Sequence, residues 1–275
     1  MKTKIVKEKQ DLTFLSWTRI RKSSGTAGSF LKAYDDSGKT KIYYKLSDYD
    51  AYYGIIGHEC VNELIADRLL TILNIPHLHY QLIHADVQID DQIYDTYLCA
   101  SENFRKPDEQ KIALDSFYEL ERKQGENKLD FCIRYGWGDY IYEMLIVDFL
   151  ILNRDRHGAN IEVLKDPATK TLRLAPLFDH GLSFLFRESD DSAIAAYDVM
   201  NDVRTNNFLG GKSTKDNLNL IPKVWVPTFN RLKETDKEII LKDLDGIISP
   251  FRAEKIWQMI YRRWQVVEDI FYKKR

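Results

Sequence analysis

The 275-residue chain has few cysteines, almost no net charge and no long apolar run. Three scattered cysteines, an odd number without paired spacing, exclude a disulfide framework and a cysteine-based metal site. The formal net charge of -2 gives no general attraction to nucleic acid or anionic membrane, and no segment approaches the ~20 apolar residues of a membrane span. The beginning, MKTKIVKEKQDLTF, lacks the apolar core of a secretory signal. These absences predict a cytoplasmic protein with reduced thiols and no direct nucleic-acid binding; export without a cleavable signal, or delivery into a host, is the alternative.

Composition is sufficient for a large core, since 44% of residues are hydrophobic and 12% aromatic. The first ~100 residues are strand-rich around one helix, and a polar stretch at 106–111 then leads into a helical part. We therefore expect an α+β chain with two lobes, a strand-rich N-lobe over 1–103 with one main helix, and a mainly helical C-lobe over 104–275.

Alternating and helical periodicity locate the main elements. Strands are predicted at 13–21, 30–34, 41–46, 83–87 and 93–100. Helices are predicted at 58–73, at 140–152, from a capping box of Thr235 with Glu238 to about residue 244, and after Ser249-Pro250.

Three polar residues that follow the apolar helix have a spacing suited to phosphoryl transfer. Asp155 precedes Asn160 in a D-x-x-x-x-N pattern, and Asp179 follows a predicted hairpin with strands at 160–164 and 172–177. Kinases use a carboxylate near the acceptor hydroxyl, and an amide and a carboxylate that hold magnesium. The order favours a kinase active site over a polar loop, with ATP and Mg2+ as cofactors, Asp155 as the catalytic residue, and Asn160 and Asp179 as metal ligands.

The N-terminal part offers partners in the order that kinases require. Lys45 lies in a strand with apolar neighbours, and the next helix carries Glu59 and Glu63 one turn apart. In kinases such a lysine binds the α- and β-phosphates and the glutamate orients it. A small-residue loop before the strand is either a plain hairpin turn or a phosphate cradle; its members are Ser23, Ser24, Gly25, Thr26, Ala27 and Gly28.

Several polar residues near Asp155 have two interpretations. Arg154 and Arg156 are either phosphate contacts or surface charges. His157 either fixes the loop by a hydrogen bond or lies near the γ-phosphate, and it is kept among the nucleotide-binding candidates. His180 follows Asp179, where it could orient that carboxylate.

Two apparent motifs are set aside. Gly211-Lys212-Ser213 looks like the end of a P-loop, but Asn206 occupies the position of the required first glycine. The histidines at 77, 79 and 84 lack an evident acidic or cysteine partner, so we interpret them as strand histidines.

The run NRDRHGAN followed by LAPLFD resembles the HipA-like serine/threonine kinase family, whose motifs are N-x-D-x-H-x-x-N and L-A-P-x-[YF]-D. Asn62-Glu63 and the N-I-P sequence at 74–76 resemble that family's helix and rank Glu63 above Glu59. The resemblance implies a two-lobed, protein-kinase-like fold and transfer of phosphate from ATP to protein serine or threonine. It also implies that Asp155 is the catalytic base, that Lys45 binds ATP phosphates, and that a hinge lies beside adenine at Glu102, Asn103 and Phe104.

Members of this bacterial family are often toxins of toxin–antitoxin pairs. In its short length the chain resembles the compact, stand-alone CtkA-like type more than the longer toxins, so whether it has an antitoxin partner is left undecided. The D-R-H-x-x-N pattern also resembles that of phosphoinositide 3- and 4-kinases. However, residues 182–212 contain three basic and five acidic side chains, and an acidic segment suits a basic protein substrate better than an anionic lipid. The leading hypothesis is a protein kinase that also phosphorylates itself, at Ser183, Ser189 or Ser192; the alternatives are a lipid or small-molecule kinase and a nucleotide-binding pseudokinase that acts as an interaction module.

Overall fold

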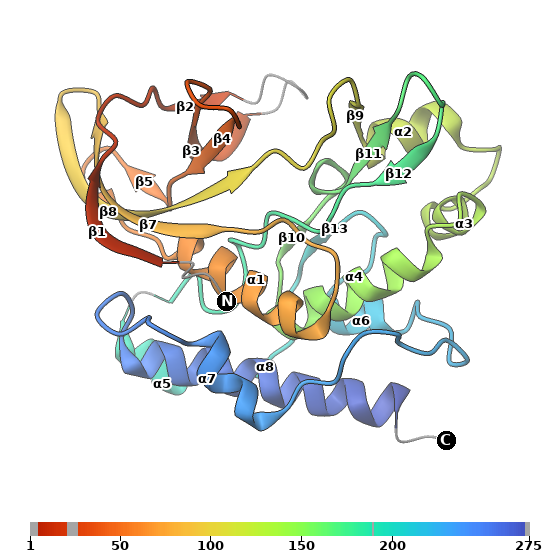
Figure 1. Ribbon diagram of the computed structural model, residues 1–275. Coiled ribbons are helices and arrows are strands. Elements are labelled where there is room, and N and C mark those ends of the chain that lie inside the picture. Colours follow the sequence, from red (N-terminus) through yellow and green to blue (C-terminus); the bar gives the residue numbers. More distant parts are fainter. Residues whose placement is uncertain (1–4, 21–26, 189, 273–275) are drawn as a thin grey trace.

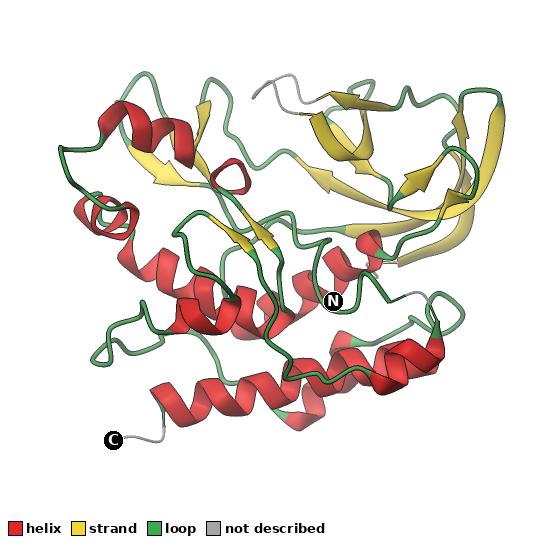
Figure 2. Ribbon diagram, turned by 180° about the vertical axis from the view of Figure 1, so that it is seen from behind, coloured by secondary structure: helices red, strands yellow, loops and turns green. Residues whose placement is uncertain are grey.

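A computed structural model describes residues 5–20, 27–188 and 190–272. Strands gather in the N-terminal part and most helices in the C-terminal part, with α1 between them (Figures 1 and 2). The expected α+β architecture is confirmed. No helix among the described residues is long and apolar enough to cross a membrane.

The N-terminal part is built on one six-stranded sheet in the order β1-β7-β8-β4-β3-β2. All neighbours in it are antiparallel except β1 and β7, which are parallel. Its strands are β1 (Ile5–Asp11), β2 (Thr18–Ile20), β3 (Ala27–Asp35), β4 (Ile42–Lys45), β7 (Gln81–Ile89) and β8 (Gln92–Glu102). A small separate pair consists of β5 (Tyr49–Asp50) and β6 (Gly54–Ile55).

Helix α1 (Glu59–Leu73) packs against β7 and β8 and is buried except at Thr71 and Ile72. Apolar residues recur at three- and four-residue steps on this helix, which fills the space beneath the sheet. It ends at Asn74, whose φ of 59° lies in the left-handed region that asparagine tolerates better than most residues. Two of its buried polar side chains, Asn62 and Glu63, face the region where the candidate site lies.

The C-terminal part surrounds α4 (Gly138–Ile151), a nearly all-apolar helix that packs against α6 and α8. Because α4 is buried, it fixes the loop that follows it to the centre of the molecule. The other helices of this part are α2 (Leu114–Glu121), α3 (Lys128–Arg134), α5 (Asp191–Ala196), α6 (Thr214–Leu218), α7 (Lys237–Ile240) and α8 (Pro250–Phe271), with 3-10 turns at Gly158–Asn160 and Glu234–Asp236.

Two small sheets carry the loops after α4. The predicted hairpin is present as β11 (Glu162–Lys165) and β12 (Leu172–Leu174), and β9 (Gln110–Ala113) joins its other edge. β10 (Asp155–Arg156) pairs in parallel with β13 (Asn206–Asn207). The division of the chain at 103/104 stays a prediction.

Two predicted elements are wrong in their limits. Residues 13–17 form no strand, because Asp11 accepts hydrogen bonds from the backbone and hydroxyl of Thr13 and turns the chain. β1 was missed because it is a charged edge strand with little alternation. The predicted capping box of Thr235 with Glu238 is absent; two residues earlier the Lys233 backbone N–H donates to the Asp236 carboxylate, and only a short helix follows.

Arg263 joins the long helix α8 to α4 and to the segment after α5. Its buried guanidinium donates to the carbonyl oxygens of Val199 (2.9 Å), Phe149 (3.0 Å) and Asn201 (2.7 Å). Arg263→Met should lower the free energy of unfolding by about 3 kcal/mol, because the three carbonyls lose their donor. Chemical denaturation measures this loss. The exposed neighbour offers the control Arg262→Met, which should change stability little; equal losses in both variants would contradict the fastening role.

Candidate active site

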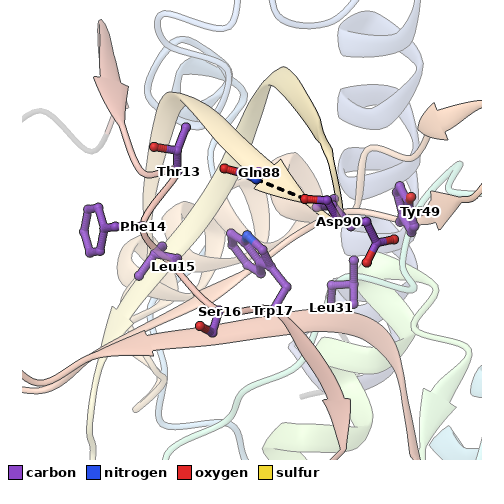
Figure 3. A pocket seen from close by; sticks show the side chains of 10 residues that line it. Thr13, Phe14, Leu15, Ser16, Trp17, Leu31, Tyr49, Gln88 and Asp90 are labelled. Atoms are coloured by element: carbon purple, nitrogen blue, oxygen red, sulfur yellow. Dashed lines mark hydrogen bonds between the residues drawn. The ribbon is translucent and has the colours of Figure 1, made fainter.

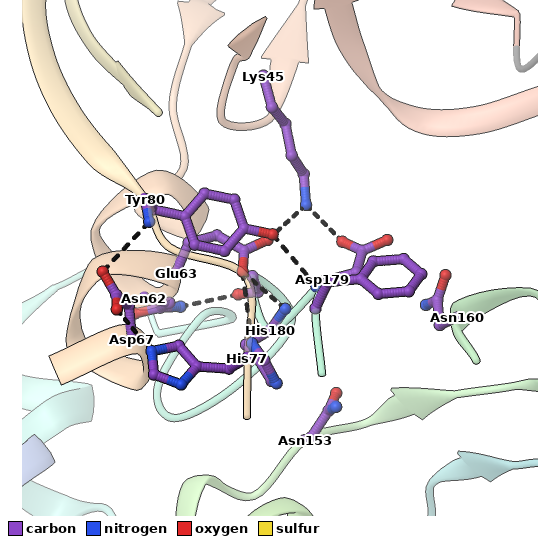
Figure 4. A network of polar contacts seen from close by, with 12 residues as sticks. Lys45, Asn62, Glu63, Asp67, His77, Tyr80, Asn153, Asn160, Asp179 and His180 are labelled. Atoms are coloured by element: carbon purple, nitrogen blue, oxygen red, sulfur yellow. Dashed lines mark hydrogen bonds and ion pairs between the residues drawn. The ribbon is translucent and has the colours of Figure 1, made fainter. Parts of the chain in front are cut away.

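The centre of the site is a lysine between two carboxylates. Lys45 Nζ donates to Glu63 Oε1 at 2.8 Å and to Asp179 Oδ1 at 2.5 Å (Figure 4). The Glu63 side chain is fully buried, and those of Lys45 and Asp179 are 11% and 17% exposed. Burial lowers the pKa of Lys45, but the charges of Asp179 and Glu63 outweigh this effect and hold that pKa well above its usual value. Lys45 is therefore a fixed ammonium, suited to bind an anion such as phosphate.

Three distant segments bring this triad together. Lys45 is the last residue of β4, Glu63 lies on α1, and Asp179 follows β12. The structure places Glu63, rather than Glu59, on Lys45; the Glu59 carboxylate accepts from the Asp48 backbone N–H instead. Asp179 has a φ of 60°, a conformation that aspartate tolerates and that turns its carboxylate toward the lysine.

Asp155 lies at the start of the loop after α4, in β10. Its backbone N–H donates to Asn153 Oδ1, and its carbonyl accepts from Asn160 Nδ2 at 2.9 Å. Its carboxylate Oδ1 accepts from Asn206 Nδ2 at 3.1 Å, while His157 Nε2 is 3.5 Å from Oδ2. The predicted loop residues are thus gathered around one partly exposed carboxylate.

A buried ion pair ties this loop to α4 and to the Asp179 segment. The side chains of Arg156 and Asp148 are each 1% exposed, and Arg156 Nη2 donates to Asp148 Oδ1 at 2.9 Å. Arg156 Nη1 donates to the carbonyls of Asn160 (3.2 Å) and Phe178 (2.8 Å). The interpretation of Arg156 as a phosphate contact or surface charge was therefore wrong, because its guanidinium is occupied inside the protein.

Arg154 also contacts protein groups. Its guanidinium donates to the Tyr197 hydroxyl at 3.2 Å and lies over the Phe186 ring. The two arginines that flank Asp155 thus hold the loop from two sides.

The residues after Asp179 are packed against α1. Asn62 Nδ2 donates to the carbonyls of Gly181 (2.9 Å) and Ser183 (3.1 Å), and the His180 backbone N–H donates to Glu63 Oε2 at 2.8 Å. A Cβ on Gly181 would lie 3.0 Å from Glu59 Cβ, which explains the need for glycine. Burial, with the charge of Arg156, holds the pKa of His180 well below its usual value, so this imidazole is neutral.

Asn160 and Asp179 have the chemistry of a magnesium site. The Asn160 amide nitrogen donates to the Asp155 carbonyl, so the amide oxygen is the atom that a cation would use. Figure 4 shows Asn160 on the side of Asp179 away from Glu63. An amide oxygen and a carboxylate fit magnesium, which binds oxygen ligands and keeps several waters.

The remaining nucleotide candidates are placed only in part. Ser23, Ser24, Gly25 and Thr26 lie outside the described residues, and Ala27 and Gly28 begin β3. Glu102 ends β8, Asn103 Oδ1 accepts from the Arg105 backbone N–H, and the Phe104 ring stacks on Phe178 with centroids 5.5 Å apart. His157 Nδ1 accepts from the Ala159 backbone N–H at 3.1 Å, so it fixes the loop; its nucleotide contact stays a prediction.

A separate pocket lies on the N-terminal sheet and is lined by ten residues from the chain after β1, from β3, from β5, and from the end of β7 with the turn that follows it (Figure 3). Its wall includes Trp17, Leu31 and Tyr49, and none of the candidate catalytic residues. We assign it no part in the candidate active site.

Sequence reasoning missed Asn206, Tyr80 and Asp148. Asn206 reaches Asp155 only through the pairing of β10 with β13, and no motif signals it. The Tyr80 hydroxyl accepts from the Asp179 backbone N–H at 3.4 Å, and burial raises its pKa well above the usual value. Asp148 carries a detectable signal, since it lies inside the apolar run at 144–151 of α4, where a buried charge requires a partner.

The sequence matches no known family profile and none of the curated proteins compared with it. Its structure is similar to that of the Helicobacter pylori proinflammatory kinase CtkA, with a TM-score of 0.60 and 17% identity over 96% of this chain and 95% of that one. Weaker similarity, with TM-scores of 0.44 and 0.42, relates it to the HipA–HipB–operator DNA complex of Shewanella oneidensis MR-1 (15% identity, 92% and 68% covered) and to the Golgi casein kinase with Mn/ADP bound (12%, 90% and 72%).

At this identity the comparison establishes the fold. The chain therefore has the kinase-like α+β fold of the CtkA structure, as its resemblance to the HipA-like kinases predicted.

Proposed function

We propose that the chain is an ATP- and Mg2+-dependent protein kinase that transfers phosphate to serine or threonine hydroxyls. The observation that carries the proposal is the placement of Lys45 between Glu63 and Asp179, beside a loop that presents Asp155 and Asn160. These are the residue types that phosphoryl transfer requires, and they come from separate parts of the chain. The CtkA-like fold supports the same conclusion.

Each residue has a distinct task in this mechanism. Lys45, oriented by Glu63, binds the α- and β-phosphates, and Asp155 accepts the proton of the acceptor hydroxyl as its oxygen bonds to the γ-phosphorus and the bond to the ADP oxygen breaks. Asn160 and Asp179 would hold magnesium, which neutralises charge on the phosphates. Asn206 positions the Asp155 carboxylate through its side-chain amide.

Of the three candidate sites for self-phosphorylation, one conflicts with the structure. Ser183 is completely buried, so it cannot reach a nucleotide in the folded protein. Ser189 lies outside the described residues, and Ser192 is exposed at the beginning of α5. Ser192 is the residue that we now propose for this modification.

Replacement of the proposed base tests the function directly. Asp155→Asn keeps the shape of the side chain but cannot accept the proton, so phosphate incorporation from labelled ATP should fall by about 10²–10⁴-fold. The control Asp166→Asn changes an acid in an exposed turn and should leave incorporation unchanged. The assay offers protein, peptide and phosphoinositide acceptors, so that lipid kinase activity would also be detected. Equal activity of Asp155→Asn and Asp166→Asn would contradict the role of Asp155.

A second prediction concerns the proposed contact of Lys45 with the ATP phosphates. Lys45→Met should weaken ATP binding and lower turnover by about 10²-fold or more, because the fixed ammonium at the phosphates is lost. Lys41→Met is a matched control, since Lys41 lies beside the same strand but stacks on the Tyr34 ring at 3.4 Å. Calorimetric titration with ATP and a turnover assay measure both effects, and unaltered ATP affinity in Lys45→Met would exclude a phosphate contact.

Replacement of Asn206 tests whether this residue positions the Asp155 carboxylate or contributes to ATP binding. Asn206→Ala should lower kcat by about 10–100-fold with little change in KM for ATP, since the Asp155 carboxylate loses its orienting donor. The control Asn201→Ala removes another exposed amide from the same segment and should behave like the unmodified protein. A loss of ATP affinity, or no change in kcat, would argue against positioning.

A further inference from the structure

Two histidines and an aspartate converge at the end of α1, beneath the Lys45 site. Asp67 Oδ1 lies 2.7 Å from His77 Nε2 and 3.0 Å from His79 Nδ1, and the three ligand atoms all lie within 4.8 Å of one another. Of the three histidines assigned to strands, only His84 lies in one, β7. His77 and His79 belong to the connection between α1 and β7, where His77 forms an isolated β-bridge with Leu177, so their assignment to a strand was wrong. The acidic partner that sequence reasoning missed comes from the preceding helix.

The contact between His77 and Asp67 requires a positive charge between them. His77 Nδ1 lies 2.6 Å from the Ile75 carbonyl oxygen, which only accepts, so Nδ1 carries the hydrogen. A neutral imidazole then presents the lone pair of Nε2 to the carboxylate oxygen at 2.7 Å, and two lone pairs at that distance repel. A cation between the two atoms removes the repulsion, either a proton or a metal ion.

The surroundings favour a metal ion. Metal-binding histidines commonly donate their second N–H to a backbone carbonyl, as His77 does to Ile75, and metal-binding carboxylates are themselves hydrogen-bonded, as Asp67 Oδ2 is to the Tyr80 backbone N–H at 3.2 Å. The side chains of Asp67 and His77 are 0% and 3% exposed, whereas that of His79 is 69% exposed. Two of the three ligands, Asp67 and His77, are thus buried and held in place by hydrogen bonds, whereas the third, His79, lies at the surface, where an ion and its waters can enter.

We propose that Asp67 Oδ1, His77 Nε2 and His79 Nδ1 bind one divalent transition-metal ion of the Zn2+ class, with water completing the shell on the exposed side. Two imidazoles and one carboxylate are ligands that zinc accepts at ~2.0–2.2 Å. Tetrahedral ligands at this distance stand about 3.4 Å apart, so binding needs only a small separation of these side chains, which the exposed His79 ring permits. Magnesium prefers oxygen ligands, so this site is chemically distinct from Asn160 and Asp179.

The bound ion would hold residues 77–79 against α1, and these residues contact the segment that leads into Asp179. Leu78 N–H donates to the Leu177 carbonyl at 2.8 Å, and Leu177 N–H donates to the Pro76 carbonyl at 3.1 Å. The Tyr80 hydroxyl reaches the Asp179 backbone as well (Figure 4). A metal ion on His77 and His79 would therefore stabilise the segment around residue 77 and the segment around Leu177 that it contacts, without taking part in chemistry.

The test uses tag-free full-length protein, stripped of metal with a chelator and dialysed, without ATP. Equilibrium dialysis against Zn2+ in millimolar Mg2+ should give one zinc per chain and a rise in Tm. His79→Ala should lower zinc affinity by at least about tenfold and lose the rise in Tm, because it removes one of three protein ligands. The control His84→Ala removes a histidine paired with Asp95, outside the cluster, and should retain both.

A second readout covers a failure of His79→Ala to fold. Co2+ added to the unmodified protein should give the visible absorption of a four- or five-coordinate site, and Zn2+ should displace it. Absence of stoichiometric zinc, equal zinc affinity in the two variants, or only the spectrum of hydrated cobalt would overturn the proposal. None of these measurements depends on kinase activity.

Discussion

The buried ion pair between Arg156 and Asp148 is the constraint on which the candidate site depends. Burial of the two charges is costly, and the cost is offset by their attraction, by the Asn153 amide that donates to Asp148, and by the two backbone carbonyls that the guanidinium satisfies. Those carbonyls belong to Asn160 and to Phe178, the neighbour of Asp179. One side chain thus fixes the relative positions of α4, the Asp155 loop and both proposed metal ligands.

The surroundings of Asp155 and Asp179 differ, and this difference suits the two tasks proposed for them. Asp179 faces the ammonium of Lys45, whereas the Asp155 carboxylate meets the neutral amide of Asn206 and the edge of His157. A carboxylate held beside a fixed ammonium is suited to bind a metal ion, while the ammonium itself is suited to bind phosphate. A carboxylate that contacts a neutral amide donor and is partly exposed can receive a proton from an incoming hydroxyl.

Local pattern was sufficient for much of the fold. The helical stripe of α8 after Ser249-Pro250, the apolar run of α4 and the hairpin of β11 and β12 were all predictable, because periodicity and turn residues are local properties. The contact of Lys45 with Glu63 could also be predicted, since kinase sites pair a strand lysine with a glutamate of the next helix.

What the sequence could not provide depends on tertiary contacts. The burial of Arg156 follows from Asp148 on the preceding helix, and its charge alone is equally typical of a surface residue. Asn206 reaches Asp155 through strand pairing across the segment between them. His77 and His79 meet Asp67 because α1 ends at Asn74 and the chain reverses, a geometry that the spacing of the three residues does not reveal.

A crystal structure with Mg2+ and a non-hydrolysable ATP analogue tests the central claim most directly. The account predicts phosphate oxygens on Lys45 Nζ, magnesium bound by Asn160 Oδ1 and the Asp179 carboxylate, and the γ-phosphate facing Asp155. A nucleotide bound elsewhere, for example in the pocket beside Trp17, or a Lys45 that keeps both carboxylates and no phosphate, would contradict it.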